Sequence, residues 1–497
     1  MSAARSVFAA AALALLAGCA VGPDFHRPVP PDTTGYTAEP LPAETAHAEV
    51  HGGEAQRFAA GEDIPGQWWT LFHSAPLNAL IERALKANPD VAAAQASLRQ
   101  AKENVYAGEG AFFPSVDGDL SATRERGSGA TFGAKGPVSI FGVSTAAVSV
   151  SYPLDVFGGT RRQVESLEAQ AEFQRFQLEA TYLTLTSNVA TAAIEESSLR
   201  AQIAATREII DAESKELEVL QQQLELGGAA KTAVLAQAAT LAQARATLPP
   251  LEKQLAQVRD QLAALTGRFP ADQPAERFEL ASMELPEKLP VSLPSVLVEQ
   301  RPDVRASEAQ LHSASAQIGV AVANMLPQLT LTGQMGAAAT PISSLFGPGT
   351  GIWSLGAGLV QPLFHGGELL HQKRAAEAAF DRAAAQYRST VLAAFQNVAD
   401  TLRALESDAN ALNAQLTSER SAADSLDLAR EQFQLGAISY LSLLTAEQTY
   451  QQARIGLVQA QASRFADTAA LFQALGGGWW NRADVALDDG PRADGAR

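Results

Sequence analysis

The sequence predicts a mixed α and β membrane protein in which a few short β-strands alternate with very long α-helices. Three observations predict this class. The chain repeats itself internally, four segments have a two-residue alternation of side chains, and long segments carry a helical period with few breakers. Of the 497 residues, 46% are hydrophobic but only 6% are aromatic. This apolar content suits closely packed long helices better than a bulky globular core.

The charge balance and the cysteine count exclude several classes of protein. The chain has 37 basic and 54 acidic side chains, which gives a formal net charge of −17. Nucleic acids and anionic lipid surfaces bind basic patches, so we expect no nucleic-acid partner. The single cysteine leaves no internal disulfide framework and no cysteine-based metal cluster. Outside the leader no run of about 18 apolar residues occurs, so no membrane-spanning helix is predicted.

The N-terminus predicts a lipid-anchored exported protein. Residues 1–18 have the pattern of a secretory signal, because Arg5 precedes an apolar stretch and small residues follow it. Residues 16–19, Leu-Ala-Gly-Cys, resemble the bacterial lipobox, whose cysteine is diacylated; the alternative is that Cys19 ends an ordinary leader by chance. Each buried methylene contributes about 0.8 kcal/mol, so two or three acyl chains would anchor the chain firmly. Ala20 follows instead of an aspartate, so we expect the periplasmic face of the outer membrane.

A tandem duplication with units of about 210 residues organises the chain. Asn88-Pro89-Asp90-Val91 recurs as Arg301-Pro302-Asp303-Val304, and Phe113-Pro114 recurs as Leu326-Pro327 with the same offset. Asn188-Val189-Ala190 recurs as Asn397-Val398-Ala399, and Leu226-Gly227 recurs as Leu435-Gly436. The expected domains are the signal at 1–18, an N-terminal tether and equatorial segment at 19–75, a first repeat at 76–267, an equatorial linker at 268–293, a second repeat at 294–477, and an equatorial or disordered tail at 478–497.

Each repeat is expected to contain three helical segments. The first segments span about 76–111 and 294–325, and the very long ones span about 160–226 and 367–435. A helix of that length extends roughly 100 Å at about 1.5 Å per residue. After a break at Leu-Gly, shorter helices at about 231–266 and 440–475 close the repeats. Two shorter helices stacked end to end can therefore lie alongside one long helix.

Two strands are expected in each repeat between the first helix and the long one. Polar and apolar residues alternate in 146–152 and 328–335, while 353–359 alternates large and small residues and 116–122 is a weaker fourth case. Loops rich in Gly, Ser and Pro, at about 124–139 and 337–351, are expected to be exposed tips. Four prolines mark the expected junctions between strands and helices: Pro114, Pro153, Pro327 and Pro362.

The interpretation of these strands depends on whether they lie in water or in a membrane. In water the same pattern would be a half-buried antiparallel sheet, whereas in an outer membrane it is a barrel strand with one lipid face and one wet face. The membrane address expected from Cys19 favours the barrel. Four strands cannot close a barrel, because about eight is the smallest number that leaves a packed interior. An open edge in lipid is prohibitive, so we expect a trimer with 12 strands.

With these residues identified, the chain resembles the outer-membrane factor family: TolC-like efflux channels of the NodT-type lipoprotein branch. The motifs that carry the resemblance are residues 19–28 (Cys-Ala-Val-Gly-Pro-Asp-Phe-His-Arg-Pro), 68–72 (Trp-Trp-Thr-Leu-Phe), 88–91, 301–304 and 474–479 (Ala-Leu-Gly-Gly-Gly-Trp). The resemblance implies a homotrimer whose 12-stranded outer-membrane barrel continues into a long periplasmic α-helical barrel. It also implies a periplasmic adaptor, an inner-membrane pump of the RND class, and passive export of small molecules.

The resemblance also assigns the two helix–turn–helix tips as the places where the channel docks its adaptor and closes. The tip residues are Leu226, Gly227, Leu435, Gly436, Ala437, Ile438, Ser439, Leu441, Ser442 and Thr445. Glycine is required there because a helix reversal needs backbone angles that are costly for other residues. The alternative is a plain loop in a helical hairpin. In some relatives acidic residues near the second tip form rings that narrow the entrance, whereas this chain has Ser442 and Thr445, so a strong cation gate there is not expected.

The other signals favour no enzyme and no metal site. His47 and His51 have a metal-like spacing but lie in a Pro-, Ala- and Gly-rich stretch, where a solvated linker is expected. We therefore expect no catalytic residue, no metal and no cofactor beyond the covalent lipid on Cys19. The second hypothesis is a lipid-anchored periplasmic coiled-coil adaptor or structural protein without a pore. It explains the helices and Cys19 but not four alternating strands.

Overall fold

The computed structural model describes residues 20–33, 35–127 and 139–482. The chain forms two compact units, each assembled from separate segments of the sequence. Unit one contains the segment that ends at Pro28, with Ser97–Arg175 and Ala306–Arg388. Unit two contains Val29–Ala96, Phe176–Arg305 and the segment from Ser389 onward. Each unit is described by itself below.

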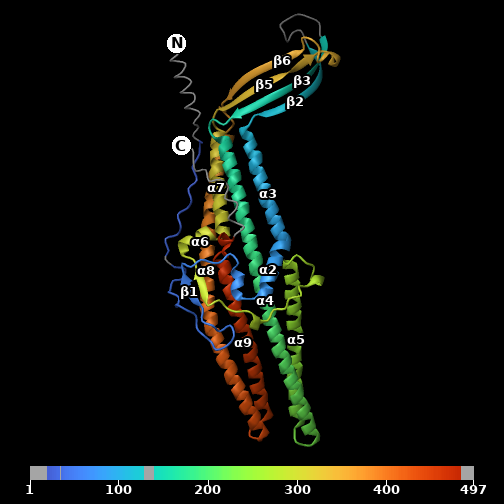
Figure 1. The fold of residues 1–497 in the computed structure, drawn as a ribbon, viewed down its shortest axis with the longest axis vertical. Helices are drawn as coiled ribbons and strands as arrows, with labels where there is room; N and C mark the ends of the chain where they lie inside the picture. Colours follow the sequence, from blue (N-terminus) through green and yellow to red (C-terminus); the bar gives the residue numbers. More distant parts are fainter. Residues whose placement is uncertain (1–19, 34, 128–138, 483–497) are drawn as a thin grey trace. The chain divides into compact units, whose positions relative to one another are not determined.

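Long helices dominate the chain (Figure 1). The two longest, α4 (Gly159–Glu225) and α8 (Glu368–Gln434), have 67 residues each. The hairpin partners α5 (Lys231–Leu265) and α9 (Tyr440–Ala474) have 35 residues each. These four helices confirm the expected ranges to within one residue at every end.

The first helical segment of each repeat is broken in two, which corrects the expectation of single helices over 76–111 and 294–325. Helices α2 (Ala75–Ala87) and α3 (Pro89–Glu109) meet at Asn88, and α6 (Pro294–Gln300) and α7 (Pro302–Ala323) meet at Arg301. Both joint residues have extended backbone, with ψ of 127° and 123°. The cause is the proline that follows each of them, whose ring disfavours a helical conformation in the preceding residue.

The main sheet lies in unit one and has four antiparallel strands in the order β2-β3-β5-β6. The strands are β2 (Ser115–Gly127), β3 (Ser139–Leu154), β5 (Gln328–Ala339) and β6 (Gly351–Val360). They are longer than expected, because β2 and β5 continue into the segments assigned to loop tips. Backbone pairs such as Arg124 with Gly142 continue the ladder between β2 and β3 into this segment. A polar composition does not prevent a segment from forming a strand.

Unit two contains a small parallel sheet that the sequence pattern did not indicate. It pairs β1 (Arg57–Ala60) with β4 (Lys288–Val291). The same unit contains an aromatic core in which Trp68 stacks on Phe472 with a centroid distance of 5.4 Å. Both rings are fully buried. Strands of four residues are too short for a two-residue period to stand out from chance.

Within the described part of the chain, the helices are not apolar over a long enough window to cross a membrane.

Candidate functional site

The four-stranded sheet separates apolar from polar side chains. The register places Val116, Val150, Gly333 and Leu355 in one row across the strands, so these side chains share a face. This apolar face carries exposed hydrophobic side chains: Val116, Leu120, Val148, Val150, Met335, Trp353, Leu355 and Leu359. The opposite, polar face carries Asp117, Asp119, Ser149, Ser151, Thr330, Thr332 and Gln334. A sheet of this kind can meet lipid on one side and water on the other.

The two outer strands of this sheet each have one free edge. Among the described residues β2 pairs only with β3, and β6 pairs only with β5. Their outward N–H and C=O groups therefore lack a strand partner in the described part of the chain. In a membrane such groups have no water to bond, so both edges need another strand.

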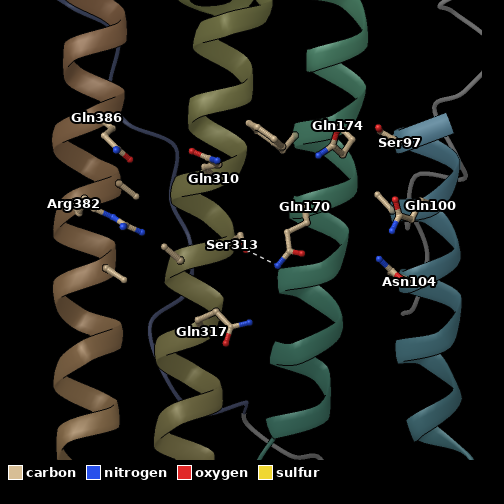
Figure 2. A pocket seen from close by; sticks show the side chains of 15 residues that line it. Ser97, Gln100, Asn104, Gln170, Gln174, Gln310, Ser313, Gln317, Arg382 and Gln386 are labelled. Atoms are coloured by element: carbon tan, nitrogen blue, oxygen red, sulfur yellow. Dashed lines mark hydrogen bonds between the residues drawn. The ribbon is translucent and has the colours of Figure 1, made fainter. Parts of the chain in front are cut away.

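A polar pocket of about 760 Å³ lies in unit one, on helices α3, α4, α7 and α8 (Figure 2). Its lining residues recur three or four positions apart on each helix, so each helix contributes one face. Amide and hydroxyl side chains dominate this lining, among them Ser97, Gln100, Asn104, Gln170, Gln310 and Gln386. Arg382 is the charged side chain of the lining, and Figure 2 shows it extending from α8 toward α7. Such a surface offers hydrogen bonds to passing polar solutes.

The N-terminal strap, residues 20–28, is fixed to unit one by a buried arginine. The guanidinium of Arg162 on α4 donates to the Val21 carbonyl at 3.1 Å and to the Asp24 carboxylate at 2.6 Å. It also donates to Glu165 at 2.7 Å. The bond to Arg162 lowers the pKa of Asp24. The Val21 N–H donates to the Phe157 carbonyl at 3.0 Å, so the strap is joined to the start of α4 by backbone and side chains.

The strap also crosses α7. Phe25 stacks on His312 with a centroid distance of 4.3 Å, and Arg27 pairs with Glu308 at 2.8 Å. Gly22 lies directly on Gly319, where a Cβ on Gly22 would stand 2.4 Å from the Gly319 Cα. These contacts give the Gly-Pro-Asp-Phe-His-Arg motif of residues 22–27 a structural role, since its glycine, aspartate, phenylalanine and arginine each contact α4 or α7. Residue 19 itself lies outside the described residues.

The two helix–turn–helix tips lie in unit two and have the same turn chemistry. Gly227 and Gly436 have φ of 78° and 71°, in the left-handed region that favours glycine. The Gly228 N–H donates to the Gln223 carbonyl at 2.7 Å, and the Ala437 N–H donates to the Gln432 carbonyl at 2.8 Å. These bonds are of the six-residue type that closes a helix end.

The tips expose apolar side chains. Leu226 and Leu435 are 87% and 84% exposed, and Leu441 is 68% exposed. Ser439 caps α9, since its hydroxyl accepts from the Ser442 N–H at 3.2 Å. The tips therefore present exposed leucines on a hydrogen-bonded backbone, which suits contact with another protein.

A buried polar cluster joins the two hairpins next to the tips. Gln237 on α5 donates to the Glu213 carboxylate of α4 at 2.5 Å and accepts from the Tyr440 hydroxyl of α9. Gln451 on α9 donates to the other oxygen of Glu213 at 2.6 Å. The sequence patterns do not indicate this cluster, because its members lie on three separate helices.

Glu447 is the least satisfied member of the cluster. It is 7% exposed, and its Oε2 has no hydrogen-bond partner among the described residues. Arg430 stands 3.9 Å from its other oxygen. Burial, with the carboxylates of Glu213 and Glu216, raises the pKa of Glu447 to about 7. Burial and the neighbouring Asp408 likewise raise the pKa of Asp467, farther along α9, to about 7.

The four expected junction prolines lie at or near strand ends. Strand β2 begins directly after Pro114 and β5 directly after Pro327. Pro153 lies near the end of β3, and Pro362 follows the end of β6. The histidine at 51 is packed and not part of a solvated linker, since its Nε2 lies 2.7 Å from the Leu280 carbonyl and its ring stacks on Phe465.

Comparisons with known proteins agree with this geometry. A family model described as "Outer membrane efflux protein" matches the chain twice, over residues 80–268 and 293–477. The pyoverdine export outer membrane protein OpmQ of Pseudomonas aeruginosa is 31% identical over 423 residues, covering 83% of this chain and 87% of the relative. The cation efflux system protein CusC of Escherichia coli is 28% identical over 476 residues, covering 93% and 96% of the two chains. The solved structure of the outer-membrane channel OprN matches with a TM-score of 0.83 at 25% identity, covering 93% of this chain and 100% of that one.

Proposed function

This chain belongs to the outer membrane efflux protein family, and we propose that it is the outer-membrane channel subunit of a tripartite efflux system. It conducts small molecules passively from a periplasmic adaptor and an inner-membrane pump across the outer membrane. The observation that carries this proposal is the sheet with one apolar face, one polar face and two free edges. A lipid-anchored adaptor without a pore has no use for such a sheet.

The free edges support a homotrimer. Four strands are too few to enclose a lumen, and each of the edge strands β2 and β6 needs a partner. If β6 of one copy pairs with β2 of the next, three copies close a barrel of 12 strands with the polar face inside. The polar pocket on the four helices then belongs to the inner surface of a helical barrel that continues this lumen.

The repeated architecture supports a tandem duplication. The family model matches the two halves separately, and the long and short helices have equal lengths in both. In a trimer this duplication gives six similar repeats around the axis. The domain boundaries follow the repeats, with an equatorial linker at 268–293 between them.

The anchor and the partners complete the proposal. Cys19 carries the covalent lipid at the end of the strap, and no other cofactor is required. The exposed leucines of the two tips support docking to a periplasmic adaptor, and the pump is of the RND class. The channel is gated by a shift between two states: the tips converge and close the channel at rest, and adaptor binding moves them apart and opens it.

Planar-bilayer recording of the purified full-length protein tests the proposed function. We expect discrete ion-conducting steps, together with heat-labile migration at the mass of a trimer in detergent. Tyr440→Phe removes the hydroxyl that bonds to Gln237, so it should increase the open fraction without changing the step size. A protein that remains monomeric and never conducts, with or without this substitution, would support the adaptor hypothesis instead.

A further inference from the structure

The strap lies in a groove between α4 and α7. This groove has room for the strap because the residue of α7 that faces it is Gly319. A Cβ on Gly319 would lie 2.7 Å from the Cγ of Arg162 and 2.8 Å from the Val21 carbonyl oxygen. The strap therefore passes at the crossing of Arg162 and Gly319 because Gly319 has no side chain.

The duplication gives each of these two residues an equivalent in the other repeat. Helices α4 and α8 have the same length, which aligns Arg162 with His371. Helices α3 and α7 both begin at the proline of the repeated Pro-Asp-Val motif, which aligns Gly319 with Tyr106. The glycine of one repeat is thus a tyrosine in the other. Tyr106 is 61% exposed within the chain, and His371 is exposed as well.

In a closed ring of three copies, which contains six similar repeats, grooves of two kinds alternate. One is the groove between α4 and α7 within a chain, and the other lies between α8 of one copy and α3 of the next. Each chain has one N-terminus and hence one strap, so the groove between copies has none. We propose that Tyr106 fills this second groove by packing against His371 of the neighbouring copy, in the place that the strap takes in the first.

Physical chemistry favours this arrangement. An aromatic ring that is largely exposed on the single chain gains from burial in an interface, and tyrosine keeps its hydroxyl available for a polar partner. In the groove within a chain, Arg162 and Gly319 leave room for the backbone of the strap. In the groove between copies, the phenol ring of Tyr106 and the imidazole ring of His371 can stack in the equivalent space. The inference rests on the proposed homotrimer and names a contact on which its assembly depends.

Paired cysteines test the contact in the full-length protein in outer-membrane vesicles. Tyr106→Cys with His371→Cys should form disulfides between chains and give covalent dimers and trimers on a non-reducing gel. The matched control is Gly319→Cys with Arg162→Cys, the equivalent pair, which should close within one chain and leave the monomer mass unchanged. If the wild type is trimeric but the 106–371 pair keeps free thiols or closes within a chain, the inference is wrong. A monomeric wild type would overturn the proposed function as well.

Single substitutions separate the two grooves. Gly319→Tyr should displace the strap and speed hydrogen exchange of the Val21 amide by about tenfold or more, because its bond to Phe157 is lost. Tyr106→Gly should leave this protection intact but lower the temperature at which the trimer dissociates. Unchanged Val21 protection in the first variant, or an unchanged dissociation temperature in the second, would contradict the assignment of the grooves.

Discussion

At the scale of one residue, the burial of Glu447 predicts that the stability of α9 near the tips depends on pH. Its raised pKa of about 7, against an ordinary 4.5, means that the folded state keeps a proton that the unfolded state has lost in this range. The stabilisation is complete below the ordinary pKa and disappears as pH rises toward the folded pKa. We predict that protection of α9 amides around Glu447, corrected for intrinsic exchange, falls by roughly 30-fold (about 2 kcal/mol) between about pH 5 and pH 7.5.

Glu447→Gln should remove this dependence, because an amide mimics the protonated carboxyl and does not titrate. The control is Glu431→Gln, an exposed glutamate on α8, which should leave the pH profile unchanged. The measurement must resolve individual amides, since Asp467 titrates elsewhere on the same helix. A flat profile in the wild type would refute the prediction.

At the scale of one element, the duplication predicts the register in which the free edge of β6 would pair with β2 of the next copy. Val148 pairs with Met335 across β3 and β5, and the repeat offsets translate this pair to Ala357 and Ala122 of the next copy. Both alanines lie on the apolar face, as a correct register requires. We predict that Ala357→Cys with Ala122→Cys forms an interchain disulfide under mild oxidation.

The control pair is Ala357→Cys with Ser121→Cys, whose second member lies on the polar face of the same strand. It should cross-link at least about tenfold more slowly, because its side chain points away from the partner. Equal rates for the two pairs would mean that the edge strands are not paired in this register.

Elements with a strong period could be predicted from sequence, whereas long-range contacts could not. The long helices and alternating strands repeat their pattern over many residues, so local sequence determines them. The breaks at Asn88 and Arg301 were missed even though prolines follow them, because the apolar period continues across the break. The strap partners Asp24 and Arg162 are 138 positions apart, and no local pattern joins them.

At the scale of the whole molecule, the net charge of −17 and the carboxylates on the polar face predict a cation-preferring pore. Asp117 and Asp119 of β2 would face the lumen in each of three copies. In a KCl gradient the reversal potential should have the sign for potassium, and Asp117→Asn with Asp119→Asn should move it toward zero. Glu252→Gln, at a carboxylate paired with Arg207 at 2.8 Å, removes charge elsewhere and should leave the potential unchanged. Anion preference in the wild type would contradict this reading of the polar face.

Unit two joins segments from opposite ends of the chain, and this constrains the order of events during biogenesis. Gln56 bonds to Thr468, and the buried Arg464 donates to the Glu54 carbonyl at 3.0 Å. Strand β1 likewise lacks its partner in the parallel sheet until β4 exists. A chain exported from its N-terminus therefore carries its early segments, Trp68 and Phe72 included, as exposed apolar surface until α9 emerges. Folding of this unit therefore cannot be completed before α9 has emerged, and contacts between residues so far apart in sequence slow the formation of a fold.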